Sequence, residues 1–169
     1  MATNKYREAD DKGRDIFIDY CKRQNWCTFK KASKDDYAHW DVSYLSGDTM
    51  VIGEIKVREY ESTDYNGWFL EVFKYNELKH LQSKMKEKNK DVQIHYINIY
   101  TNQEIIIWDL DKTLLNKNTL NLPKTTMEDN GEKIKQIYTV YKAEAVVNEP
   151  INKVHKIDNN VESDDDLPF

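Results

Sequence analysis

The sequence has no apolar run that approaches the roughly 20 residues needed to cross a bilayer, so we expect no transmembrane helix and no membrane partner. Its first residues, MATNKYREADDKGRD, lack the apolar segment of a secretory signal. Two cysteines, Cys21 and Cys27, are too few for a disulfide framework or a four-cysteine zinc site. These absences predict a protein of the reducing cytoplasm.

The charge is unevenly distributed along the 169 residues. The segment from Ile157 to Phe169 holds five acidic residues and no Lys or Arg, which equals the formal net charge of −5. Residues 1–156 are therefore neutral overall, with 25 acidic and 25 basic side chains. An acidic total does not exclude nucleic acid as a partner, because local patches decide such binding.

The spacing of apolar residues predicts one mixed α/β domain. We expect helices at about Asn4–Gln24 and Leu70–Asn89, and strands at Trp26–Lys31, Tyr37–Leu45, Met50–Val57, Val92–Tyr100 and Glu104–Leu110. The run Ile105–Trp108 is apolar on both faces, which is typical of a strand covered on both sides.

A second hairpin is expected near the C-terminus. Asn130-Gly131 is a strong turn signal between candidate strands at Leu122–Glu128 and Lys133–Val147. Beyond residue 147 the sequence is polar and charged without periodicity. We therefore expect a folded domain at 1–147 and a disordered acidic tail at 148–169.

The first hairpin places acidic residues opposite each other. If Gly47-Asp48 is a two-residue loop, Asp41 lies opposite Glu54, and Lys56 shares their face. Two facing carboxylates repel, and a Mg²⁺ or Mn²⁺ ion between them would convert repulsion into ligation. The lysine would orient or deprotonate a water, or stabilise charge on a phosphate. The alternative is a solvated strand face with ordinary ion pairs.

Two short motifs carry a resemblance to a known family. His-Trp-Asp-Val-Ser around Asp41 and Gly-Glu-Ile-Lys-Val-Arg around Glu54, set between two helices, resemble the PD-(D/E)XK nuclease superfamily over about Tyr6–Leu110. The segment Leu-Pro-Lys-Thr-Thr before the Asn-Gly turn is similar to small phage-encoded members. One departure is Trp40, which stands where the superfamily motif has proline.

This resemblance implies a restriction-endonuclease-like fold, an α-β-β-β-α-β core with a mixed sheet flanked by helices, here with an extra C-terminal hairpin. It implies a metal site at Asp41, Glu54 and Ile55, with Lys56 as the catalytic lysine. A further acid often comes from the first helix in such nucleases, so Asp15 and Glu8 are candidates. For both, a solvated helix charge is the alternative.

Other candidates are more peripheral. Glu71 is expected at the start of the second helix, where an acid suits the helix dipole or joins the site. The residues expected to contact DNA are His39, Arg58, Lys74, Lys124, Thr125 and Thr126. An exposed histidine and a polar strand edge are the alternatives for His39 and for the Lys-Thr-Thr segment.

The last residues, Asp164, Asp165, Asp166, Leu167, Pro168 and Phe169, resemble the acidic tip of bacterial single-stranded DNA-binding proteins. The resemblance implies docking on host replication or repair proteins. The terminal ring would fill an apolar pocket while the α-carboxylate meets Arg or Lys at its rim. The alternative is a solvated tail that aids solubility.

These features predict a Mg²⁺-dependent deoxyribonuclease of phage or mobile-element replication, recombination or repair, in the cytoplasm of a bacterial host. One alternative is a non-catalytic DNA-binding or adaptor protein that recruits replication proteins through its tip. Another is a single-stranded DNA-binding protein of unusual fold. In that case bases would stack on Trp40, Tyr44, Tyr60, Tyr65 and Trp68.

Overall fold

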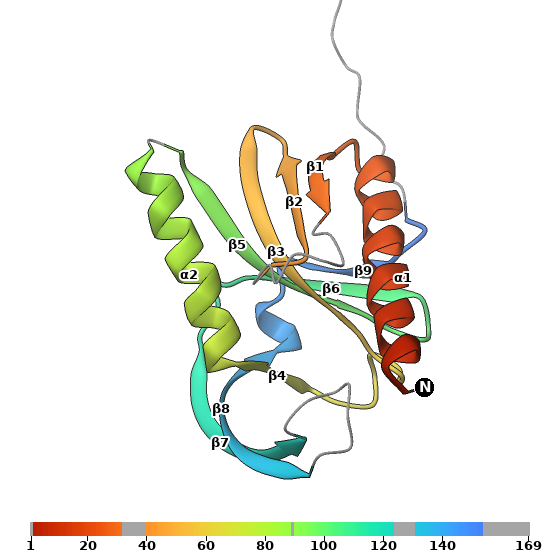
Figure 1. Cartoon of the computed structure of the whole chain (residues 1–169). Helices are drawn as coiled ribbons and strands as arrows, with labels where there is room; N and C mark the ends of the chain where they lie inside the picture. The colour runs from red at the N-terminus through yellow and green to blue at the C-terminus, as the bar shows by residue number, and fades with distance from the viewer. Residues whose placement is uncertain (1, 32–39, 89, 124–130, 154–169) are drawn as a thin grey trace, which may run out of the picture.

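A six-stranded mixed sheet and a three-stranded antiparallel sheet form the framework of the protein (Figure 1). The computed structural model describes residues 2–31, 40–88, 90–123 and 131–153. The helices are α1 (Ala2–Arg23) and α2 (Val72–Glu87), with one 3₁₀ turn at Lys142–Glu144. The strands are β1 (Cys27–Lys31), β2 (Val42–Ser46), β3 (Thr49–Val57), β4 (Gly67–Glu71), β5 (Val92–Ile99), β6 (Glu104–Asp109), β7 (Asn116–Pro123), β8 (Glu132–Tyr141) and β9 (Val147–Pro150).

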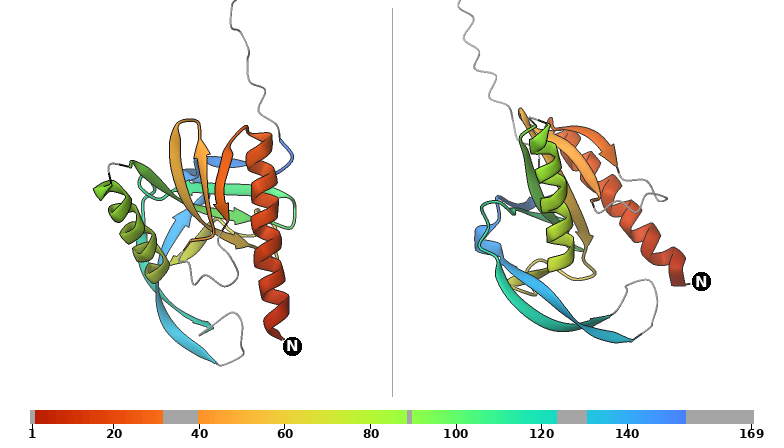
Figure 2. Two further views of the ribbon diagram at one scale, coloured as in Figure 1. Left: turned by 45° about the horizontal axis from the view of Figure 1, so that its top comes forward. Right: turned by 60° about the vertical axis from the view of Figure 1, so that its left-hand side comes forward.

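The expected mixed sheet flanked by helices is confirmed. The larger sheet has the order β1-β2-β3-β5-β6-β9, and β3 pairs in parallel with β5 after the crossover through α2. All its other neighbouring pairs are antiparallel. Helices α1 and α2 lie on opposite sides of this sheet in the two views of Figure 2. Neither helix of the described chain is long and apolar enough to cross a membrane.

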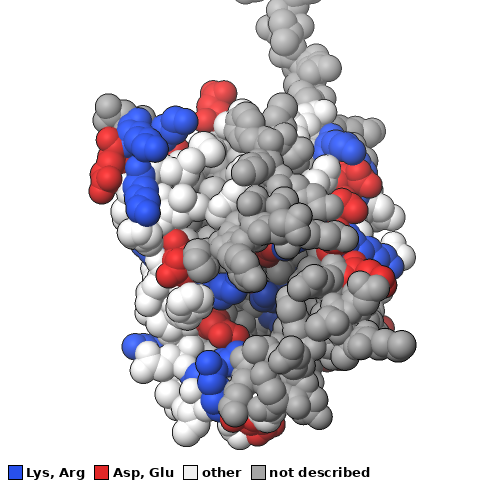
Figure 3. Space-filling view, in the orientation of Figure 1, with Lys and Arg blue, Asp and Glu red and all other residues white. Residues whose placement is uncertain are grey.

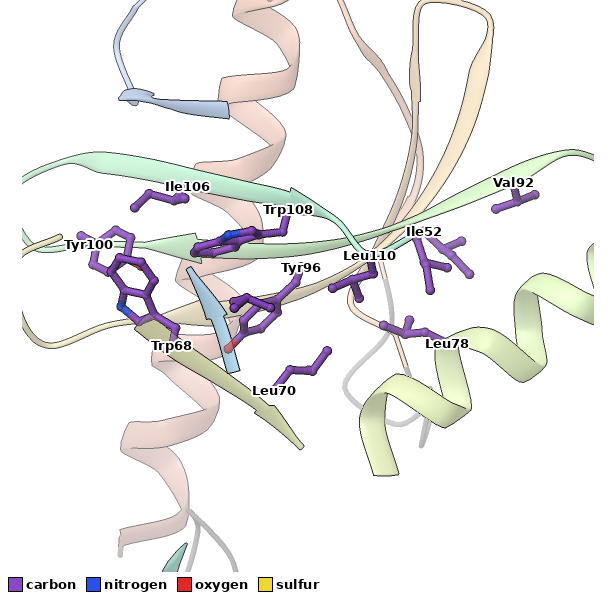
Figure 4. Close-up of a cluster of buried hydrophobic side chains, with 12 residues drawn as sticks. Ile52, Trp68, Leu70, Leu78, Val92, Tyr96, Tyr100, Ile106, Trp108 and Leu110 are labelled. Carbon is purple, nitrogen blue, oxygen red and sulfur yellow. The ribbon is translucent and has the colours of Figure 1, made fainter. Parts of the chain in front are cut away.

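Each face of the large sheet has its own apolar core. On the α1 side, Phe17 and Tyr20 pack with Tyr44 of β2. On the α2 side, the core contains Leu78 of the helix and Trp108 of β6, together with side chains of the smaller sheet (Figure 4). The run Ile105–Trp108 is fully buried, so the prediction of a strand covered on both faces is confirmed.

The structure corrects the expected start of the second helix. Gly67–Glu71 is a strand that pairs with β8, and the helix begins at Val72. Trp68 and Leu70 are buried while the residues between and after them are half-buried, which is the two-residue period of a strand. Glu71 ends β4 and is also the N-cap of α2, so its predicted place at the start of the second helix is confirmed.

The C-terminal part also differs from the sequence-based prediction. The expected C-terminal hairpin is present as β7 and β8, but its register differs from that of a two-residue loop at Asn130-Gly131, because Pro123 pairs with Glu132. The strand expected at 133–147 is divided by the 3₁₀ turn, and β9 pairs with β6 of the larger sheet. The folded part thus extends past residue 147, because Val147–Pro150 belongs to the sheet.

Candidate active site

The β2–β3 hairpin brings Asp41 next to Glu54. Ser46 pairs with Thr49 and Val42 with Gly53, which is the predicted two-residue register. Asp41 directly precedes β2. Its N–H donates to the Gly53 carbonyl oxygen at 2.8 Å, and its Oδ2 accepts from the Ile55 N–H at 2.8 Å. Asp41 is therefore bonded to the residues on either side of Glu54.

The alternation expected before β2 stops at Asp41. Val42 and Tyr44 belong to the α1-side core, as a shared face requires, but Trp40 packs against the α2-side core. Asp41 forms a bend, and its side chain takes the Ile55 N–H that a strand carbonyl would otherwise bind. Trp40 therefore does not share a face with Val42 and Tyr44.

Glu54 is a buried carboxylate held by two lysines. It is 1% exposed in the middle of the sheet, where it pairs with Tyr96 of β5. The Lys56 Nζ lies 2.8 Å from Glu54 Oε1, and the Lys74 Nζ, in the first turn of α2, lies 3.4 Å from the same oxygen. Pairing of this kind offsets the cost of burying a charge.

The first helix contributes a cation that the sequence analysis missed. Arg14 of α1 donates to Asp41 Oδ1 from Nη2 at 2.6 Å and from Nε at 3.1 Å. Its Nη1 also donates to Asp11 Oδ1 at 3.3 Å. The preceding residue, Gly13, interrupts the helical pattern and was the available signal.

Of the three candidate additional acids, two are on α1 and one ends β4. Asp15 and Glu8 are exposed on α1, and the Glu71 carboxylate is 2.8 Å from the Lys135 Nζ on β8. Across the ranges that the structure describes, no group of three or more His, Cys, Asp or Glu side chains is placed to hold a metal ion. Among the described residues, Asp41 and Glu54 are therefore brought together without a third side chain placed to share a metal ion with them.

The pKa values of the two carboxylates are shifted in opposite directions. Burial raises the pKa of Asp41, the Glu54 charge raises it further, and Lys56, the Ile55 N–H and Arg14 oppose the rise. Burial would also raise the pKa of Glu54, but Lys56 and Lys74 outweigh it and hold that pKa below its usual value. Burial alone would lower the pKa of Lys56, yet Glu54 raises it.

The donor set fits a hard divalent cation that keeps part of its water shell. Asp41 and Glu54 offer carboxylate oxygens, and the Glu54 charge raises the pKa of Asp41. Mg²⁺ commonly binds through one or two carboxylates, with waters and substrate phosphate oxygens completing its octahedron. Lysines and Arg14 add positive charge around this pair, and Figure 3 shows Lys and Arg side chains gathered in a hollow between α2 and α1.

Arg58 makes internal contacts: its guanidinium donates to Asn98 Oδ1 and to the Tyr96 hydroxyl oxygen, each at 2.6 Å, and lies over the Phe69 ring. His39, Lys124, Thr125, Thr126 and the tip from Asp164 to Phe169 lie outside the described residues.

The aromatic side chains argue against broad base stacking. Tyr44 and Trp68 are buried in the two cores, and Trp40 and Tyr60 are half-buried. Of the five aromatics expected to stack bases, Tyr65 is the one that is largely exposed, at 56%. Stacking on Tyr44 or Trp68 is therefore incompatible with the fold.

No protein-family model matches the chain, and no curated protein sequence matches it. The chain is similar in structure to Hjc of Archaeoglobus fulgidus, a Holliday junction resolvase from an archaeal hyperthermophile. The TM-score is 0.48 and the sequence identity 12%, and the match covers 82% of this chain and 95% of that one.

Proposed function

We propose that the protein is a metal-dependent nuclease that hydrolyses phosphodiester bonds in DNA. The observation that carries this proposal is the buried Glu54 carboxylate, placed beside Asp41 by the hairpin register and contacted by Lys56. Burying a carboxylate and repelling it with a second one costs stability. This arrangement of two carboxylates and a lysine suits a catalytic metal site.

Each residue has a distinct role in the proposed site. Asp41 and Glu54 hold the divalent cation, Mg²⁺ or Mn²⁺, and Ile55 is the third protein ligand. When bound, the cation supplies Lewis-acid polarisation of the phosphate and lowers the pKa of a coordinated water. Lys56 stabilises negative charge that develops on the phosphate. The Ile55 N–H fixes the orientation of the Asp41 carboxylate.

The proposed substrate follows from the charge around the carboxylates. Lys56, Lys74 and Arg14 surround the two acids with cations, which favours a polyanion. The resemblance of the two motifs to the PD-(D/E)XK superfamily supports DNA rather than another phosphodiester. We place the activity in recombination, replication or repair of phage or mobile-element DNA, in a bacterial cytoplasm.

A cleavage assay on defined DNAs tests the proposal directly. We expect the full-length protein to cut at least one of single-stranded, duplex, flapped or four-way branched DNA with Mg²⁺ or Mn²⁺, and none with EDTA. Asp41→Asn keeps the size of the side chain but removes the charge that a cation needs, so cleavage is expected to fall by about 10²–10³-fold.

Two outcomes would contradict the nuclease proposal. Cleavage that survives EDTA, or an Asp41→Asn variant as active as the natural protein, rejects the assigned site. DNA binding with no cleavage of any substrate in either metal favours the non-catalytic adaptor. Lys117→Gln, an exposed change on β7, is the matched control and is expected to cut normally.

We propose a second, separable role for the tail as a docking tip for host proteins that recognise single-stranded DNA-binding protein tips. Phe169→Ala is expected to weaken that binding about ten- to hundredfold, because burial of one aromatic ring contributes roughly 1.5–3 kcal/mol. Cleavage of naked DNA should be unchanged. Pull-downs from bacterial lysate with the natural and Phe169→Ala proteins, beside a DNA titration, measure both effects. Identical partners for the two proteins reject the role.

A further inference from the structure

Gly13 lets α1 approach the end of β3 more closely than any other residue would. A Cβ atom at this position would lie 2.3 Å from Val57 Cγ2, well inside van der Waals contact. Glycine in a helix interior costs roughly 1 kcal/mol relative to alanine, so its presence here needs a compensating gain. The gain is proximity: the next residue, Arg14, reaches the Asp41 carboxylate at the start of β2.

The two oxygens of the Asp41 carboxylate bind different partners, Arg14 and the protein backbone. Arg14 Nη2 and Nε both donate to Oδ1, while Oδ2 accepts from the Ile55 N–H. The two side chains are largely shielded from solvent, at 15% and 16% exposure, so the pair is much less hydrated than a surface ion pair. A cation that binds Asp41 through Oδ1 must therefore displace the guanidinium.

A phosphate group is a second anion that the displaced guanidinium can bind. Its planar array of N–H donors matches the oxygens of a phosphate as well as those of a carboxylate. The proposed substrate brings such oxygens to the same place. Asp11, whose Oδ1 is 3.3 Å from Arg14 Nη1, tethers the side chain at the site during the exchange.

We propose that Arg14 is a positioning residue that holds Asp41 until the cation arrives and then transfers to a DNA phosphate oxygen. This inference rests on the proposed nuclease function. This exchange makes cation binding and DNA binding mutually favourable. The cation releases Arg14 from Asp41, and the DNA phosphate draws Arg14 away from Asp41. Arg14 thereby weakens binding of the free cation and strengthens binding of DNA once the cation is present.

The proposal predicts that loss of Arg14 changes cation affinity and DNA affinity in opposite directions. Arg14→Gln is expected to bind Mn²⁺ alone about fivefold more tightly than the natural protein in calorimetry, since one shielded ion pair no longer competes. The same variant should bind substrate DNA about fivefold more weakly than the natural protein does, measured in Ca²⁺ so that the DNA stays uncut. Arg14→Lys should restore most of the DNA affinity, and Lys22→Gln, exposed on the same helix, should change neither.

A structural role for Arg14 predicts a different pattern. If Arg14 served the fold alone, Arg14→Gln would weaken Mn²⁺ and DNA binding together and lower the melting temperature. That result, or unchanged affinities for both ligands, overturns the inference while leaving the nuclease proposal intact if the natural protein cuts. Should Arg14→Gln not fold, Arg14→Lys decides, with tighter Mn²⁺ binding expected and weaker binding contradicting it. A natural protein that neither binds Mn²⁺ nor cuts DNA rejects both proposals.

Discussion

Glu54→Gln is expected to lower the rate of DNA cleavage by about 10³-fold at saturating DNA. The amide has almost the same size as the carboxylate but is neutral, so it is a poor ligand for a divalent cation. It also leaves Lys56 and Lys74 without the negative charge that now lies between them. Single-turnover cleavage in Mg²⁺ measures the effect, and calorimetry with Mn²⁺ shows whether cation binding is lost with it.

The fold is expected to tolerate this change, which separates chemistry from stability. Lys56 and Lys74 are partly exposed, so water replaces the lost partner of each ammonium. Glutamine also costs less to bury than an ionised carboxylate. We expect the free energy of unfolding to change by no more than about 1 kcal/mol. A variant that unfolds readily, or one that cleaves at the natural rate, contradicts the assignment.

Lys56→Met provides the companion result. It removes the ammonium but keeps most of the apolar stem, so cleavage should fall about 10²–10³-fold while Mn²⁺ binding is retained or strengthened. Lys112→Met is the matched control, because Lys112 is also paired with a carboxylate, but with Asp109 rather than with Asp41 or Glu54. Loss of cation binding in Lys56→Met would show that the lysine supports the fold of the site rather than the reaction.

The first hairpin was predictable because its determinants are local. A glycine with positive φ, Gly47, follows Ser46 in a two-residue loop, and the register of β2 and β3 follows from that loop. Asp41 then lies beside Glu54, and Lys56 shares the face of Glu54 because both are on one strand. The course of the chain at Trp40 was not predictable, since it depends on the Asp41 side chain replacing a backbone acceptor.

The parts of the site that come from distant segments were harder to predict. Arg14 reaches Asp41 because α1 packs closely on β3 at Gly13, and the glycine alone does not indicate which residue the helix brings to Asp41. Lys74 was expected to contact DNA, but its ion pair with Glu54 depends on where α2 crosses the sheet. Strand β9 is short and polar, so pairing with β6 rather than its own sequence determines its structure.

The largest effect on stability is expected at Trp108, which joins the two sheets. The side chain is fully buried on β6, and its ring lies against Trp68 of β4 and Tyr96 of β5, with centroids 5.3 and 5.7 Å away. Its indole N–H donates to the Tyr141 carbonyl oxygen at 2.8 Å, at the end of β8. One side chain thus connects the sheet that carries Glu54 to the smaller sheet, whose strand β4 leads into α2.

Trp108→Ala is expected to lower the free energy of unfolding by about 3–5 kcal/mol, since a large cavity opens and the Tyr141 carbonyl loses its donor. That is a substantial part of the roughly 5–15 kcal/mol that stabilises a domain of this size. Trp108→Phe keeps most of the ring and should lose less than half as much. Urea denaturation measures both, with the exposed Leu114→Ala as a control that changes stability by less than about 0.5 kcal/mol. If Trp108→Ala unfolds at the same urea concentration as the natural protein, the contact between the two sheets does not stabilise the fold. In that case the position of α2, and of Lys74 at the site, must be fixed by other contacts.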